Sequence, residues 1–213
     1  TLSPSQDFNG SEIFTVTVND GNLEDFETFT LTVNAVNDAP VLATVSDVSF
    51  DEDGSGSVSL SAGDVDGDDL SYSITGGSDI TATLDGSDVT FSAPQDYNGS
   101  ESFTVTVTDG SLDDSQSFAV TVNAVNDAPT ANAASGTTNE DQSTVIALSG
   151  SDIDGDNLEF SLDSDASNGS VTLDGSLATY TPDTDYNGDD SFIFSVSDGE
   201  LSATAQVTLS IEA

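Results

Sequence analysis

The chain has 213 residues, of which 40 are Asp or Glu and none is Lys, Arg or His, so its formal net charge is -40 at pH 7. Such a negative surface repels phosphate backbones and anionic lipid headgroups, which argues against nucleic acid and direct membrane contact and favours divalent cations as partners. Cys is also absent. Because the usual nucleophiles, bases and anion clamps are missing, the sequence predicts a protein that is not an enzyme.

An internal repeat sets the domain organisation. The sequence VNAVNDAP at Val33–Pro40 recurs at Val122–Pro129, an offset of 89 residues. The same offset relates three copies of an Asp-aromatic-Asn-Gly motif, which begin at Asp7, Asp96 and Asp185. We therefore expect an incomplete repeat over 1–38 followed by complete repeats over 39–127 and 128–213. The incomplete first copy leads us to expect that the chain is a segment of a longer array of repeats.

Short alternating segments within each copy predict the fold. High net charge with few aromatic residues is also typical of disordered chains, but Phe103, Val105 and Val107 alternate with polar residues as in a half-buried strand. Turn signals divide the second repeat into seven such strands, at about 41–50, 56–62, 69–75, 79–84, 88–93, 101–108 and 115–123. This count predicts an all-β chain of tandem immunoglobulin-like, seven-stranded Greek-key sandwiches.

The acidic residues gather in loops at the ends of these predicted sandwiches. Each connection in an antiparallel sandwich switches ends, so strand parity places Glu52, Asp53 and Asp96 at the far end of the second repeat. It places the Asp-x-Asp-Gly-Asp motifs at the near ends, facing the linkers. A single such motif is also found in solvated turns, whereas its recurrence beside each linker favours an ion with six to eight oxygen ligands. Calcium fits this ligand set better than magnesium.

The sequence therefore predicts calcium at two linkers. The ligands expected at the first linker are Asp7, Asn37, Asp38, Asp64, Asp66, Asp68 and Asp109. The ligands expected at the second linker are Glu52, Asp96, Asn126, Asp127, Asp152, Asp154, Asp156 and Asp198.

In this order the motifs resemble the cadherin-like repeats of large bacterial surface and biofilm adhesins. Glu52, Asp96, Asn126-Asp127-Ala128-Pro129 and Asp152-Ile153-Asp154 stand where cadherins place their calcium-binding motifs. Two positions depart from the cadherin pattern. Asn123 stands where the cadherin linker begins with Asp, and Asp96-Tyr97-Asn98 lacks the Glu of the usual acidic pair.

The resemblance implies a secreted, extracellular or cell-surface protein of bacterial origin. It also implies a calcium-stiffened spacer in an adhesin or matrix fibre. Its expected partners are neighbouring repeats, other copies in a filament, and a glycan or surface target elsewhere in the full protein.

The sequence leaves two other functions open. The first is a calcium-dependent carbohydrate-binding module, although the chain has no Trp for a stacking platform. The second is a fibre subunit assembled by strand donation, because the incomplete first repeat lacks the strands that would cover its hairpin.

Overall fold

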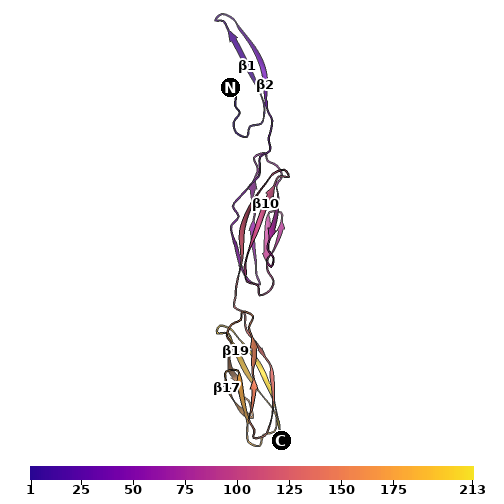
Figure 1. The fold of residues 1–213 in the computed structure, drawn as a ribbon, viewed down its shortest axis with the longest axis vertical. Coiled ribbons are helices and arrows are strands. Elements are labelled where there is room, and N and C mark those ends of the chain that lie inside the picture. Colours follow the sequence, from indigo (N-terminus) through magenta and orange to yellow (C-terminus); the bar gives the residue numbers. More distant parts are fainter. The chain divides into compact units, whose positions relative to one another are not determined.

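The computed structural model describes residues 1–213 and contains only strands, turns and irregular segments. It has no helix of the length and apolar character needed to cross a membrane. The chain forms two compact units, Thr1–Ala124 and Val125–Ala213. The first unit contains a two-stranded hairpin and the second repeat, and the other unit contains the third repeat (Figure 1). The predicted all-β class with tandem immunoglobulin-like domains is confirmed.

The incomplete first repeat is an antiparallel hairpin of β1 (Gly10–Asn19) and β2 (Glu24–Val33). No other strand pairs with it, and much of its apolar surface is exposed to solvent, including 68% of Val18 and 67% of Phe26. The alternation of apolar and polar residues therefore forms the strands even where no second sheet covers them.

The second repeat is a sandwich of two main sheets, ordered β4-β11-β10-β7 and β5-β9-β8, with a short β3-β6 pair. Its strands are β3 (Val41–Leu42), β4 (Val48–Asp51), β5 (Ser55–Ser59), β6 (Ala62–Gly63), β7 (Ser71–Gly76), β8 (Thr81–Asp85), β9 (Asp88–Ser92), β10 (Gly99–Thr108) and β11 (Asp113–Asn123). Phe91, Phe103 and Phe118 fill the core between the sheets, and the Phe91 and Phe103 ring centroids lie 5.2 Å apart.

The predicted strand 41–50 is wrong in one respect, because it is two strands in different sheets. β3 pairs with β6, whereas β4 pairs in parallel with β11. Side chains of β11 bond this part of the chain: Asp114 accepts a bond from the amide of Leu42 at the end of β3, and Gln116 bonds both backbone groups of Val45 between the two strands. These side chains replace a sheet ladder, which the alternation of apolar residues does not reveal. The predicted strand 56–62 similarly divides into β5 and β6.

The third repeat has the same arrangement, with sheets ordered β13-β20-β19-β16 and β14-β18-β17 and a β12-β15 pair. Its strands are β12 (Thr130–Asn132), β13 (Ala134–Asn139), β14 (Thr144–Ala147), β15 (Ser149–Ser151), β16 (Glu159–Ser164), β17 (Gly169–Asp174), β18 (Leu177–Pro182), β19 (Gly188–Ser197) and β20 (Ser202–Glu212). Tyr180, Phe192 and Phe194 are among its fully buried side chains.

One carboxylate in each complete repeat holds the loop that leads into the three-stranded sheet. Glu101 accepts hydrogen bonds from the amides of Ser78, Asp79 and Ile80 and from the Ser78 hydroxyl, at 2.6 to 3.1 Å. The Ser78 side-chain bond, followed by the backbone bonds, lowers the pKa of Glu101 to about 2. Asp190 binds the corresponding loop of the third repeat. These acids therefore stabilise the fold and are not free ligands.

Candidate metal-binding loops

The Asp-x-Asp-Gly-Asp loop of the second repeat folds around the side chain of Asp64. Its Oδ1 accepts hydrogen bonds from the backbone amides of Asp66, Gly67 and Asp68, at 2.9, 3.0 and 3.3 Å. Gly67 has a φ of 79°, which closes the turn and favours glycine. The other oxygen, Oδ2 of Asp64, is buried and has no hydrogen-bond partner. A buried carboxylate oxygen without a donor is costly, and a cation is a partner that would satisfy it.

Three carboxylates converge at this loop. Ligand oxygens of Asp64, Asp66 and Asp68 all lie within 4.8 Å of one another. Burial, followed by repulsion from Asp64 and Asp66, raises the pKa of Asp68. Since no Lys, Arg or His exists in the chain, no internal cation can relieve this repulsion. An external positive ion bound at this loop would relieve the repulsion.

The preceding linker is bonded to the same end of the repeat. The Asn37 side-chain amide donates to Oδ2 of Asp109 at 2.9 Å, and the Asp38 backbone amide donates to Oδ2 of Asp66 at 2.8 Å. Oδ1 of Asp109 accepts bonds from Ser111 and Leu112. The backbone bond from Leu112, then the Asn37 side-chain bond, lowers the pKa of Asp109. Asp109 thus orients Asn37, whose carbonyl oxygen remains available as a ligand.

The third repeat reproduces this geometry within its own unit. Oδ1 of Asp152 accepts bonds from Gly155 and Asp156, and Oδ2 of Asp152 is buried without a partner. Ligand oxygens of Asp152, Asp154 and Asp156 lie within 4.8 Å of one another. The linker bonds also recur, from Asn126 to Asp198 at 3.0 Å and from the Asp127 amide to Asp154 at 2.8 Å.

Aspartates at the opposite ends of the repeats adopt an unusual backbone conformation. The five residues with positive φ other than glycine are all Asp, with values from 56° to 60°, and they are Asp7, Asp53, Asp96, Asp141 and Asp185. Few residues other than glycine tolerate this region, and such local strain is concentrated at functional sites.

Asp53 is one of these aspartates with positive φ, and the predicted ligand set does not include it. Its Oδ1 accepts a hydrogen bond from the Asp96 amide at 3.3 Å, and Asp141 bonds Asp185 in the same way. The recurrence of this pair could have identified Asp53, since Asp141 is its counterpart in the third repeat. The neighbouring Glu52 is 93% buried, with only 7% of its surface exposed.

Within the first unit, the structure brings predicted ligands from two repeats to one cavity. Asp7, Asp38 and Asp66 help to line a space of about 270 Å³. At the second linker, Glu52 and Asp96 belong to one unit and the remaining predicted ligands to the other. Their sharing of an ion across that linker stays a prediction.

The fold and these loops together define a protein of tandem β-sandwich repeats with acidic end loops. The chain belongs to the bacterial Ig domain family, whose model matches residues 37–123 and 126–210. This family assignment places both complete repeats in a single class.

Proteins similar to this chain match different shares of its length. A 61-residue stretch is 49% identical to chitinase A of Pseudoalteromonas piscicida, and it makes up 28% of this chain and 7% of the chitinase. The chain thus spans less than a tenth of this curated relative. Human protocadherin-24 EC1-2 matches with a TM-score of 0.57 and 19% identity, covering 83% of this chain and 99% of that one. Mouse protocadherin-24 EC1-3 matches with a TM-score of 0.52 and 15% identity, covering 95% and 79%.

Proposed function

We propose that the chain is a non-catalytic, extracellular spacer of an adhesin or matrix fibre, in which calcium ions bound at the linkers stiffen the array. The observation that carries this proposal is the buried, unpartnered Oδ2 of Asp64 and its counterpart on Asp152. Two loops in separate units leave the same atom unsatisfied, which favours a recurring ligand over a chance defect.

The residues around each loop fit calcium by their chemistry. Carboxylate oxygens, an Asn carbonyl and backbone carbonyls are the ligands that calcium prefers. Asp64, Asp66 and Asp68, with Asn37 and Asp38, would hold the ion at the first linker. Asp152, Asp154 and Asp156, with Asn126 and Asp127, would hold it at the second. The ion supplies positive charge that offsets the repulsion among these carboxylates.

Stiffening follows when ligands from the preceding repeat complete each site. Asp7 at the first linker, and Glu52 and Asp96 at the second, are the residues proposed for this role. Without the ion, the clustered carboxylates repel one another and the linkers flex, whereas shared ligands would restrain them. A stiffened array of this kind would separate or project other parts of a longer protein.

A direct test compares calcium with excess chelator. Extracellular modules bind calcium at about 10⁻⁴ to 10⁻³ M. Calcium at 100 times the Kd would stabilise the folded state by about 2.7 kcal/mol for each site. We expect the melting temperature of the third repeat to rise by several degrees in calcium. Small-angle X-ray scattering should also show a more extended, less flexible particle in calcium.

The matched variants are Asp152→Asn and Asp163→Asn, which remove the same charge from one repeat. The side chain of Asp163 is exposed and makes no hydrogen bond, so its variant should keep the full calcium effect. Asp152→Asn should remove most of the effect at the second linker. An identical calcium response in the two variants, or scattering that does not change with calcium, would refute the proposal.

A further inference from the structure

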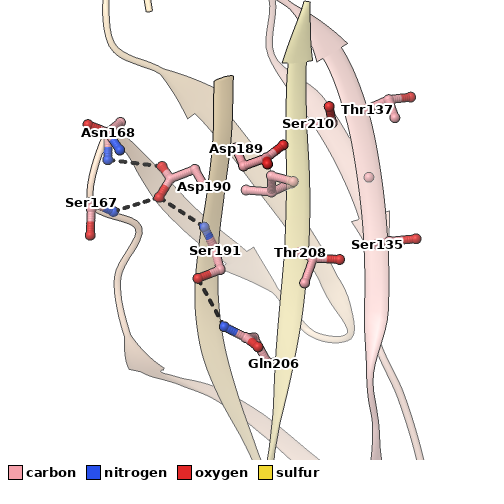
Figure 2. Close-up of a pocket in the computed structure, with 12 residues that line it drawn as sticks. Ser135, Thr137, Ser167, Asn168, Asp189, Asp190, Ser191, Gln206, Thr208 and Ser210 are labelled. Carbon is pink, nitrogen blue, oxygen red and sulfur yellow. Dashed lines mark hydrogen bonds between the residues drawn. The ribbon is translucent and has the colours of Figure 1, made fainter. Parts of the chain in front are cut away.

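A polar groove crosses the solvent face of the third repeat, away from its metal-binding loop. It has a volume of about 640 Å³ and runs over β13, β20 and β19 to the loop at Ser167 and Asn168. Figure 2 shows Ser135 and Thr137 on one strand, Thr208 and Ser210 on the next, and Asp189 on the third. Its volume lies within the range of about 300 to 1,000 Å³ typical of ligand sites.

Five side chains in this groove make no hydrogen bond within the protein, and all five are exposed: Ser135, Thr137, Asp189, Thr208 and Ser210. Two neighbours are held in place instead. Gln206 donates to the Ser191 hydroxyl at 3.0 Å, and Asp190 is occupied by the amides of Ser167 and Asn168 (Figure 2). The groove therefore combines a fixed rim with a row of unused donors and acceptors.

The corresponding sheet face of the other repeats differs at specific positions. Ser100 and Thr121, which correspond to Asp189 and Ser210, bond each other at 3.0 Å. The first repeat has the same hydroxyl pair, between Ser11 and Thr32 at 2.9 Å. Ala119 stands where the third repeat has Thr208, and its amide is bonded to Asp47. At the positions of Asp189 and Ser210, only the third repeat leaves both side chains unpaired, because Asp189 replaces the Ser of the other two copies.

The spacing of the free groups suits a polyhydroxylated chain. Side chains at alternate positions of a strand lie about 6.6 Å apart, and neighbouring strands lie about 4.8 Å apart. Thr208 and Ser210 follow the first spacing, and Ser135 and Thr137 repeat it on β13. This lattice of hydroxyls can exchange hydrogen bonds with successive sugar rings, since a hydroxyl both donates and accepts.

The charge of the groove and of the protein determines which polysaccharides can bind. Asp189 adds a carboxylate to the groove, and the protein carries a net charge of -40 without any cationic side chain. Acidic and sulfated polysaccharides are therefore repelled. We propose that this groove binds a neutral polysaccharide, with Thr208, Ser210, Thr137 and Asp189 as the principal contacts. This site is independent of calcium, because it uses none of the loop ligands.

The test is an NMR titration of the full chain, in chelator, with three neutral oligosaccharides: cellohexaose, laminarihexaose and N-acetylated chitohexaose. At least one should shift the amide signals of β13, β19 and β20. An acidic oligoalginate should leave them unchanged. Absence of shifts with all three neutral probes, shifts centred on the second repeat, or binding of the alginate alone would overturn the proposal.

Two variants separate the groove from the rest of the surface. Thr208→Val with Ser210→Val keeps strand propensity and removes two hydroxyls, so affinity should fall by about tenfold or more. Asp189→Ser with Ser210→Thr recreates the hydroxyl pair of the other repeats and should weaken binding similarly. Thr121→Val in the second repeat is the matched control. Unchanged affinity in both groove variants would refute the site.

Calcium provides the last distinction. Binding that persists in chelator supports the groove and leaves the spacer function to be judged separately by scattering. Binding that appears only with calcium would place the sugar at the acidic end loops and overturn this assignment.

Discussion

The hairpin of the first repeat and the corresponding hairpin of the second repeat have one geometry in two environments. Gly10 pairs with Val33 as Gly99 pairs with Val122, and every later pair follows at the same offset. Their burial differs sharply. Val18 is 68% exposed, whereas its counterpart Val107 is fully buried. Register is thus a local property of these sequences, while burial depends on strands far away in the chain.

The second hairpin is buried because further strands surround it. β7 pairs with β10, and β4 pairs with β11. The sheet of β5, β9 and β8 covers the apolar face, and Phe91 packs against Phe103 and Phe118. In the first hairpin, Phe14 and Phe29 stack on each other at 5.6 Å but have no such cover.

The largest expected difference is in the response to removal of an aromatic ring. Phe103→Ala should destabilise the second repeat by about 3–5 kcal/mol, because it leaves a cavity in a closed core. Phe14→Ala removes the corresponding ring from the open hairpin and should leave the unfolding of the second repeat unchanged. Urea unfolding followed through the NMR amide signals of the second repeat measures both. Similar losses in the two variants would contradict the comparison.

A smaller difference is expected at the matched acids Glu101 and Glu12. Glu101 accepts bonds from three backbone amides, whereas the side chain of Glu12 is exposed and makes no hydrogen bond. Glu101→Gln should destabilise the second repeat by about 1–3 kcal/mol. The carboxylate accepts hydrogen bonds at both oxygens, whereas the Gln side chain would place an NH₂ group, itself a donor, against backbone N–H donors. Glu12→Gln is the control and should have no measurable effect. Equal stability of the two variants in thermal unfolding would exclude this role.

The same residue predicts a pH dependence. Hydrogen bonds from Ser78 lower the pKa of Glu101 from its usual 4.5 to about 2. A lowered carboxyl pKa contributes stability that is fully present above 4.5 and is lost as the pH falls toward 2. The second repeat should therefore lose stability over that window, and Glu101→Gln should flatten the loss. A variant that retains the full slope between pH 4.5 and 2 would assign the effect to other acids.

Much of this arrangement is predictable from the sequence. The 89-residue offset and the alternation of Phe103, Val105 and Val107 predict the repeats and the sandwich class. The division of strand 41–50 is not predictable in this way, because Asp114 and Gln116 act on it from more than 70 residues away. Pattern reasoning detects local periodicity, whereas such bonds depend on the folded topology.

The candidate sites show the same limit. The recurring Asp-x-Asp-Gly-Asp motif predicts which acids gather, and ligand oxygens of Asp64, Asp66 and Asp68 do lie together. The sequence does not reveal that Asp109 orients Asn37, because both residues are merely polar and lie 72 positions apart. The groove on the third repeat is also hidden, since it depends on which hydroxyls remain unpaired.

The smallest expected effect concerns a feature that both hairpins share. Ser11 and Thr32 bond across one hairpin at 2.9 Å, and Ser100 and Thr121 bond across the other at 3.0 Å. Both pairs face solvent, so Thr121→Val should change the stability of the second repeat by only about 0.2–1 kcal/mol. Thr32→Val should leave that stability unchanged, as expected for the open hairpin. Proton exchange of the flanking amides should rise slightly and equally in both hairpins, because the bond lost is local. A much larger effect in the second hairpin would mean that this exposed pair is coupled to the core, and that local and distant contributions are not separable there.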